Sequence, residues 1–264
     1  MTFTPPVLFV PHGVPTFALR PGAAGAALIA AARKLPRPRA IVIISAHWDT
    51  ATPTVGCADR LETLHDFWGF PEELYTLRYP ATGCHEAAQD VVAAIQSAGL
   101  PVQVDLERGL DHGAWIPLRL MFPDADIPAI PLSIQSQGGP EAAYRLGQAL
   151  APLVDRGFLV IASGNLTHNL RDFQTARRSG GQTPGYVLEF TAWVAERLAA
   201  RDFSSLLDYR RQAPGAVQAH PTDEHLLPLH VALGAAGHPV EIQRLHAGID
   251  DYVIAMDAYA FLPR

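Results

Sequence analysis

The sequence predicts an α/β protein, a single layered domain in which helices flank a central, mixed and mostly parallel sheet. Strand-like runs alternate with helical stretches along the 264 residues, an order typical of layered α/β domains. The strongest runs, IVIIS and FLVIA, are apolar without interruption, as expected for strands buried on both faces. No Ser/Gly tract or charge block divides the chain, so we expect one domain over residues 1–264.

Eight segments have the composition of strands. They are 7–11 (VLFVP), 40–46 (AIVIISA), 53–57 (PTVGC), 101–105, 127–133 (IPAIPLS), 157–163 (GFLVIAS), 239–245 (PVEIQRL) and 251–261. The last segment alternates only weakly between apolar and polar residues, and we expect a late antiparallel strand there.

Six further segments have helical character: 22–35, 84–99, 139–155, 183–200, 203–212 and 224–236. In 84–99, Ala and Val recur at helical spacing and Gly99 supplies a stop signal. For 224–236 we expect Thr222 or Asp223 to be the N-cap, which would place His225 in the first helical turn.

Composition narrows the functional class. A hydrophobic content of 48% allows a sizeable core, and a net charge of −6 without a Lys/Arg cluster argues against a nucleic-acid surface. No apolar run approaches the roughly 18 residues of a membrane span, and the N-terminus does not have the pattern of a signal peptide. The two cysteines, Cys57 and Cys84, form no CxxC pair and are interpreted as reduced thiols. We therefore expect a cytoplasmic protein without membrane or nucleic-acid partners.

Five histidines lie where a predicted strand ends or a predicted helix begins: His12, His47, His112, His168 and His225. Ligands bind at the carboxyl edge of open α/β sheets, and imidazole serves both as metal ligand and as acid/base. Each histidine alone fits a structural role equally well, but their shared placement favours one metal site with an acid/base beside it. Small hydrogen-bonding neighbours of His168 suggest a pKa near neutrality.

The segment 65–83 (HDFWGFPEELYTLRYPATG) combines aromatic residues with prolines and glycines. It is too apolar for an ordinary solvated loop and too interrupted for one continuous helix. It is either a lid or wall of an aromatic-ligand pocket, or a loop packed on its own core. In the first case Phe67 and Trp68 would contact the substrate.

Eight segments, taken in order, resemble the signature blocks of the DODA-type (DOPA 4,5-dioxygenase-like) extradiol ring-cleavage dioxygenases of the class III, LigB-like superfamily. The segments are PHGVPTFAL, SAHW, DFWGFPEELY, YPATG, LDHGAWIPL, MFPDADIPAIPLS, SGNLTHNLRDF and HPTDEHLLPL. The resemblance implies a LigB-like fold and one divalent metal ion, Fe(II) for catalysis, with Zn(II) as another ion the site could hold. It also implies cleavage of a DOPA-like catechol by dioxygen to a muconic semialdehyde.

The resemblance also implies roles for individual residues. The metal ligands fall on His12, His47 and His225. His168 is implied as the acid/base and, in DODA-like members, is close enough to count as a fourth ligand; His112 is implied as a second catalytic residue that hydrogen-bonds substrate or oxygen. Because the wider superfamily uses two histidines and a carboxylate, Glu224 is an alternative ligand. Two other functions stay open at this point: a zinc-dependent hydrolase on the same histidines, and a metal-binding protein without turnover.

Overall fold

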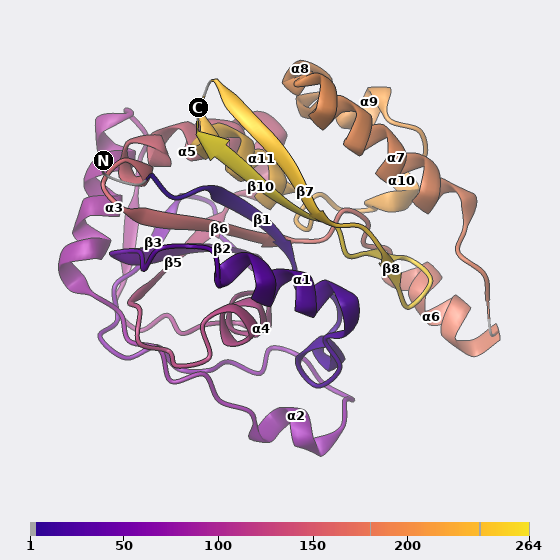
Figure 1. Cartoon of the computed structure of the whole chain (residues 1–264), viewed down its shortest axis with the longest axis horizontal. Helices are drawn as coiled ribbons and strands as arrows, with labels where there is room; N and C mark the ends of the chain where they lie inside the picture. Colours follow the sequence, from indigo (N-terminus) through magenta and orange to yellow (C-terminus); the bar gives the residue numbers. More distant parts are fainter. Residues whose placement is uncertain (1–3, 180, 238, 264) are drawn as a thin grey trace.

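The computed structural model describes residues 4–179, 181–237 and 239–263; residues 1–3, 180, 238 and 264 of the expected domain lie outside it. Figure 1 shows a central twisted sheet with helices on both of its faces. The sheet has eight strands in the order β4-β3-β5-β2-β6-β1-β10-β7. The predicted fold class, a single α/β domain with a mixed and mostly parallel sheet, is confirmed.

The strands are β1 (Val7–Pro11), β2 (Ala40–Asp49), β3 (Thr54–Gly56), β4 (Gln103–Asp105), β5 (Ala129–Ile134), β6 (Phe158–Gly164), β7 (Val240–His246), β8 (Ile249–Asp250), β9 (Ile254–Ala255) and β10 (Ala258–Pro263). The central strands β5, β2, β6 and β1 run parallel, whereas β10 pairs antiparallel with both β1 and β7. All residues of β1, β5 and β6 are buried, which accounts for their uninterrupted apolar sequences.

The helices are α1 (Gly22–Ala32), α2 (Glu72–Thr76), α3 (His85–Ser97), α4 (His112–Met121), α5 (Gly139–Val154), α6 (Leu170–Ser179), α7 (Gly185–Ala200), α8 (Phe203–Leu207), α9 (Tyr209–Gln212), α10 (Ala216–Ala219) and α11 (Leu227–Ala236), with 3-10 turns at Pro15–Ala18 and Ser136–Gly138.

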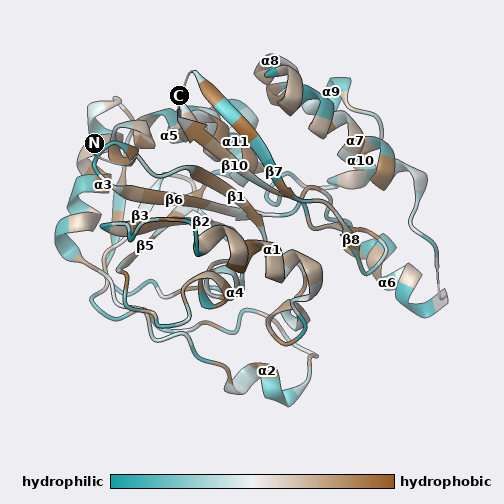
Figure 2. Ribbon diagram, viewed as in Figure 1, coloured by the Kyte–Doolittle hydropathy of each residue, from teal (hydrophilic) through white to brown (hydrophobic). Residues whose placement is uncertain are grey.

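Two apolar clusters lie on the two faces of the sheet. One contains side chains of α3, α5 and α11, and the other contains side chains of α1 and α4. Figure 2 shows the central strands as the most continuously hydrophobic part of the chain, with hydrophilic residues on the outer surfaces of the helices. Because helices cover both faces of the sheet, its strands are held rigidly, and so is the edge at which their carboxyl ends lie.

Three expected elements differ from the structure. The strand expected over 251–261 is divided into β9 and β10, and buried Asp257 lies at the break, where it pairs with Arg244 of β7. The helix expected over 203–212 is two short helices, α8 and α9. The helix expected over 224–236 begins only at Leu227, with Pro228 in its first turn, where proline is favoured.

No helix within the described ranges is long and apolar enough to cross a membrane.

A buried histidine away from the sheet edge predicts a pH-dependent stability. His230 lies in α11 and donates to the carbonyl oxygen of Leu206 at 3.0 Å, and burial lowers its pKa from 6.5 to about 4. As the pH falls below about 6.5, His230 binds a proton in the unfolded chain before it does so in the folded protein. The free energy of unfolding is therefore unaffected by His230 above about pH 6.5 and falls progressively between pH 6.5 and pH 4. One pKa unit corresponds to about 1.4 kcal/mol, so the loss is roughly 3 kcal/mol.

The measurement is urea denaturation in chelator at pH 7 and pH 4. His230→Gln keeps an N–H donor but does not titrate, so we expect its free energy of unfolding to fall less than that of the wild type. If the free energy of unfolding falls equally in the wild type and in His230→Gln between pH 7 and pH 4, His230 is not a source of the pH dependence.

Candidate metal centre

The carboxyl ends of three neighbouring strands bring the histidines together. Strands β2, β6 and β1 are adjacent and parallel, so the residues after them emerge at one edge. His12 follows β1 directly, and His168 lies in the segment between β6 and α6. This is the edge at which open α/β sheets bind ligands.

His47 lies inside β2, not after it as the sequence suggested. The strand continues to Asp49, but its pairing with β5 is interrupted between Ile44 and Asp49. His47 is therefore beyond the regular ladder, and its side chain is 22% exposed.

His112 is the first residue of α4. The Asp111 side chain accepts a hydrogen bond from the Ala114 backbone N–H and so caps this helix. A Cβ at Gly113 would lie 2.4 Å from Ser45 Oγ and 2.9 Å from a ring carbon of His47. Glycine at this position therefore lets the start of α4 approach His47 closely.

His225 lies just before α11, not in its first turn. Its carbonyl oxygen accepts from the Asn165 backbone N–H at 3.0 Å, which ties this segment to the end of β6. A Cβ at Gly164 would lie 2.3 Å from the same carbonyl oxygen. The sequence around the end of β6 thus permits the contact that brings His225 to the sheet edge.

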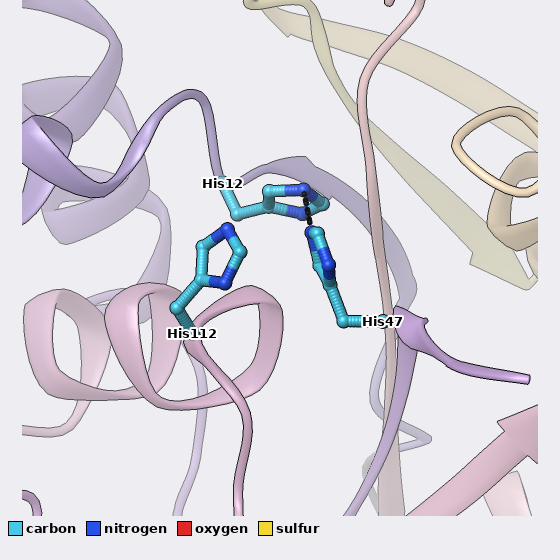
Figure 3. A group of neighbouring side chains, drawn as sticks. All are labelled: His12, His47 and His112. Atoms are coloured by element: carbon cyan, nitrogen blue, oxygen red, sulfur yellow. Dashed lines mark hydrogen bonds between the residues drawn. The ribbon is translucent and has the colours of Figure 1, made fainter. Parts of the chain in front are cut away.

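Four imidazoles converge at this edge, and Figure 3 shows His12, His47 and His112 turned toward one another. The Nε2 atoms of His12 and His47 are 3.2 Å apart. The ring of His225 is centred 5.3 Å from that of His12 and 4.9 Å from that of His47. The ring of His112 is centred 4.0 Å from that of His47.

Hydrogen bonds at the Nδ1 atoms determine where the ring protons lie. Ser163 Oγ donates to the Gly113 carbonyl oxygen at 2.5 Å, so it accepts from His12 Nδ1, which is 3.0 Å away. His12 therefore keeps a bare Nε2 facing His47. The side-chain amide nitrogen of Asn165 lies 3.3 Å from this same Nε2.

His225 follows the same pattern. Its Nδ1 lies 3.3 Å from Glu224 Oε1, and that oxygen also accepts from the Thr222 hydroxyl at 2.8 Å. His225 Nε2 is buried and has no hydrogen-bond partner among the described residues. A buried nitrogen lone pair without a donor is costly in a protein interior.

The Asp66 carboxylate, which was not among the site residues expected from the sequence, serves two histidines. Both of its oxygens lie 3.0 Å from His112 Nδ1, and Oδ2 lies 3.5 Å from His47 Nδ1. Burial alone would raise the Asp66 pKa, but hydrogen bonds from His112 and the charges of both histidines lower it to about 2. A carboxylate only accepts, so His112 Nδ1 donates to Asp66, and the nearby carboxylate favours the His47 proton on Nδ1, which leaves the His47 Nε2 free for an ion.

The arrangement fits a divalent cation. Burial, followed by the neighbouring imidazoles, lowers the pKa values of His12, His47 and His225 well below 6.5, so all three are neutral at pH 7, the form that binds metal. Nitrogens about 2.1 Å from one ion are roughly 3.0–3.4 Å apart at coordination angles between 90° and tetrahedral, and the His12–His47 separation lies in this interval.

Within the described residues, two groups of side chains have ligand atoms close enough to share an ion: His12 with His47 and His112, and His168 with Glu224 and His225. The resemblance had instead implied His12, His47 and His225, with His168 as a fourth ligand. The structure therefore brings all the expected ligands to one edge and adds His112 to them.

His168 stacks on His225. The two rings are 3.4 Å apart and inclined by 8°, and the His168 backbone N–H donates to the Ala219 carbonyl oxygen. Burial, followed by the charges of His220 and His112, lowers the His168 pKa to about 3. The expectation of a pKa near neutrality is thus wrong: the low pKa keeps this imidazole neutral at pH 7, the form that a base requires, but also makes it a weaker base than a free histidine.

The aromatic segment borders the cluster through Asp66 and also through Phe67. Phe67 is buried, and its ring meets that of His112 edge-to-face at 5.6 Å. Phe67 also packs against Phe70 and Tyr75. The neighbouring Trp68 is 86% exposed. The segment thus packs partly on its own core and partly on the histidine cluster.

Comparison with known proteins identifies the class to which this fold and site belong. Residues 21–256 match the family described as the catalytic LigB subunit of aromatic ring-opening dioxygenase, and the chain belongs to this family. The family expected from the sequence is thereby confirmed.

Among curated proteins, the chain is similar to 4,5-DOPA dioxygenase extradiol of Beta vulgaris, with 39% identity over 96% of this chain and 95% of the relative. It is also 39% identical to 4,5-DOPA dioxygenase extradiol of Escherichia coli, over 87% of this chain and 84% of the relative. A crystal structure of an uncharacterized protein from Escherichia coli K12 matches with a TM-score of 0.79 and 32% identity, covering 97% of this chain and 99% of that one.

Proposed function

We propose that this protein is an Fe(II)-dependent extradiol dioxygenase that cleaves a DOPA-like catechol with dioxygen to a muconic semialdehyde. The observation that carries the proposal is the pair of Nε2 atoms of His12 and His47, 3.2 Å apart, beside the buried Nε2 of His225, which has no hydrogen-bond partner in the described part of the chain. Membership of a ring-opening dioxygenase family and relatives named for DOPA cleavage support the reaction and the substrate class.

We assign the metal ligands to His12, His47 and His225. Each has its Nδ1 close to an oxygen of another residue, which leaves Nε2 for the ion. Glu224 is assigned to orienting His225, because its Oε1 already accepts from Thr222 and His225. A ferrous ion bound there would supply the electron transfer between catechol and dioxygen.

His168 is assigned as the base that takes a proton from a catechol hydroxyl. It is neutral, since burial lowers its pKa. Its ring stacks in parallel on that of His225, so the lone pairs of the two rings lie in separate planes, although both nitrogens are within reach of a common ion. We therefore assign His168 to proton transfer rather than to service as a fourth ligand. His112 is assigned to hydrogen bonding with the substrate or oxygen through the ring nitrogen that Asp66 does not hold.

The aromatic segment is proposed to form part of the substrate pocket, with Phe67 as a wall beside His112 and Trp68 as an exposed ring that can cover the catechol. Phe67→Ala is expected to raise KM about tenfold, the effect of losing an aromatic contact of about 1.4 kcal/mol, without loss of metal. Trp68→Ala is expected to raise KM less. Leu188→Ala, which changes an exposed apolar residue of α7, is the control. Wild-type KM in both aromatic variants would make the segment purely structural.

The decisive experiment is anaerobic reconstitution with ferrous iron, followed by a panel of catechols in air. We expect one dioxygen consumed per catechol and a yellow ring-opened product, with little activity in the zinc-loaded protein. Iron-loaded protein that consumes no dioxygen would overturn the proposal. Hydrolysis of ester or amide panels by zinc-loaded protein would instead support a hydrolase, and metal binding without either reaction would indicate a non-catalytic protein.

A further inference from the structure

Asp66 stands apart from the other residues that hold the histidines. Ser163 and Glu224 each orient one histidine, whereas Asp66 reaches both the proposed ligand His47 and the proposed catalytic residue His112. It also lies outside the strand ends and helix starts that supply the histidines, in the segment between β3 and α2.

Asp66 is itself held in place by the backbone. Its Oδ1 accepts from the His112 backbone N–H at 2.8 Å, one of the N–H groups at the start of α4 that has no intrahelical acceptor. The carboxylate is therefore anchored to the same residue whose side chain it orients. Its side chain is 28% exposed and that of His112 is 7% exposed, so water is excluded on the His112 side of this contact but reaches the Asp66 side.

The anchoring fixes one tautomer of His112. With Oδ1 occupied by the backbone N–H and both oxygens 3.0 Å from Nδ1, the ring proton belongs on Nδ1 and the lone pair on Nε2. The ring nitrogen facing the cluster can then accept a hydrogen bond or take a proton from a bound molecule. The opposite tautomer would place a bare Nδ1 against a carboxylate, which is repulsive.

We propose that Asp66 is a positioning residue that fixes the tautomer and orientation of His112 for ring cleavage and, more weakly, those of His47 for metal binding. This role rests on the proposed function, because it acts through two residues assigned there. We expect a weaker effect on His47 because Asp66 Oδ2 lies 3.5 Å from His47 Nδ1 but 3.0 Å from His112 Nδ1.

Asp66→Asn tests the proposal with little change in size. The amide oxygen can still accept from the His112 backbone, but the amide N–H₂ then faces His112 Nδ1 and favours the opposite tautomer. A comparable carboxylate-to-amide change beside a catalytic histidine costs about 10⁴-fold in a serine protease. For this partly exposed site we expect kcat to fall roughly 10²-fold and metal affinity about tenfold, with KM changing less than kcat.

A double-mutant cycle separates positioning from general structural damage. If Asp66 acts through His112, Asp66→Asn should lower kcat less than about threefold in a His112→Gln background. If Asp66→Asn lowers kcat by the same factor in the wild type and in His112→Gln, the proposal is overturned. Asp59→Asn, which changes an exposed aspartate earlier in the same segment, is the matched control and should leave kcat, metal affinity and melting temperature unchanged.

A measurement independent of turnover separates this inference from the proposed function. In the zinc-loaded protein, histidine side-chain ¹⁵N spectra should show His112 protonated at Nδ1, and Asp66→Asn should move the proton to Nε2. The same His112 tautomer in both proteins would overturn the role of Asp66. Absence of ring cleavage by every iron-loaded protein, with the tautomer change present, would overturn the proposed function and leave the positioning role intact.

Discussion

Single replacement of His12, His47 or His225 by alanine is expected to lower metal affinity at least about 100-fold and to abolish turnover. Loss of a residue that only orients a ligand costs 10- to 100-fold in affinity or activity, so loss of a ligand itself should cost more. Each substitution also leaves an open coordination position and removes one of the neutral imidazoles that the ion requires. The measurement is metal content and competition with a chelating indicator, on protein whose fold is verified by circular dichroism.

Two control variants make this test specific. His85→Ala removes an exposed histidine that bonds to Cys57 and Gln89, away from the cluster, and should keep full metal content. His112→Ala should also keep most of the metal, although its ring is close to that of His47. If His112→Ala loses the ion and His225→Ala keeps it, the third ligand is His112 and the assignment of His225 is wrong.

The sheet could be predicted well because its central strands are buried on both faces. Short, uninterrupted apolar runs such as IVIIS and FLVIA are typical of strands covered on both sides, and the positions of β2 and β6 follow from them. The C-terminal region was harder, because its interruption depends on a tertiary contact. Asp257 is buried where β10 begins and pairs with Arg244 on β7, and no local pattern marks such a pair.

The histidines of the site could be predicted for the same reason as the strands. His12 and His168 follow the buried parallel strands β1 and β6 and so emerge at the sheet edge, whereas His47 lies within β2 and His112 and His225 come from the starts of helices. Their partners could not be predicted in this way. Asp66 contacts His112 across 46 positions of sequence, and Ser163 contacts His12 across 151. In the sequence, Asp66 and Ser163 look like any other Asp and Ser, because only the folded structure places them beside the histidines.

The pKa of His168 shows a second limit of prediction from sequence. Small polar neighbours suggested a value near neutrality, but the sequence does not reveal how deeply the segment after β6 is covered. Burial lowers the value to about 3. The imidazole is therefore neutral at pH 7 but a weaker base than a free histidine.

His168→Ala is expected to retain most of the metal and to lose roughly 10²- to 10⁴-fold in turnover, the usual contribution of a general acid/base. His168→Gln keeps a side chain of similar length against the His225 ring but cannot accept and release a proton, so it should not restore the rate. The stacked rings, 3.4 Å apart and nearly parallel, are the reason for expecting metal content and turnover to separate. Iron content and turnover are measured on the same preparations. If both variants lose iron and turnover together, His168 is a fourth ligand. If turnover stays near normal, His168 is neither an acid/base nor a ligand.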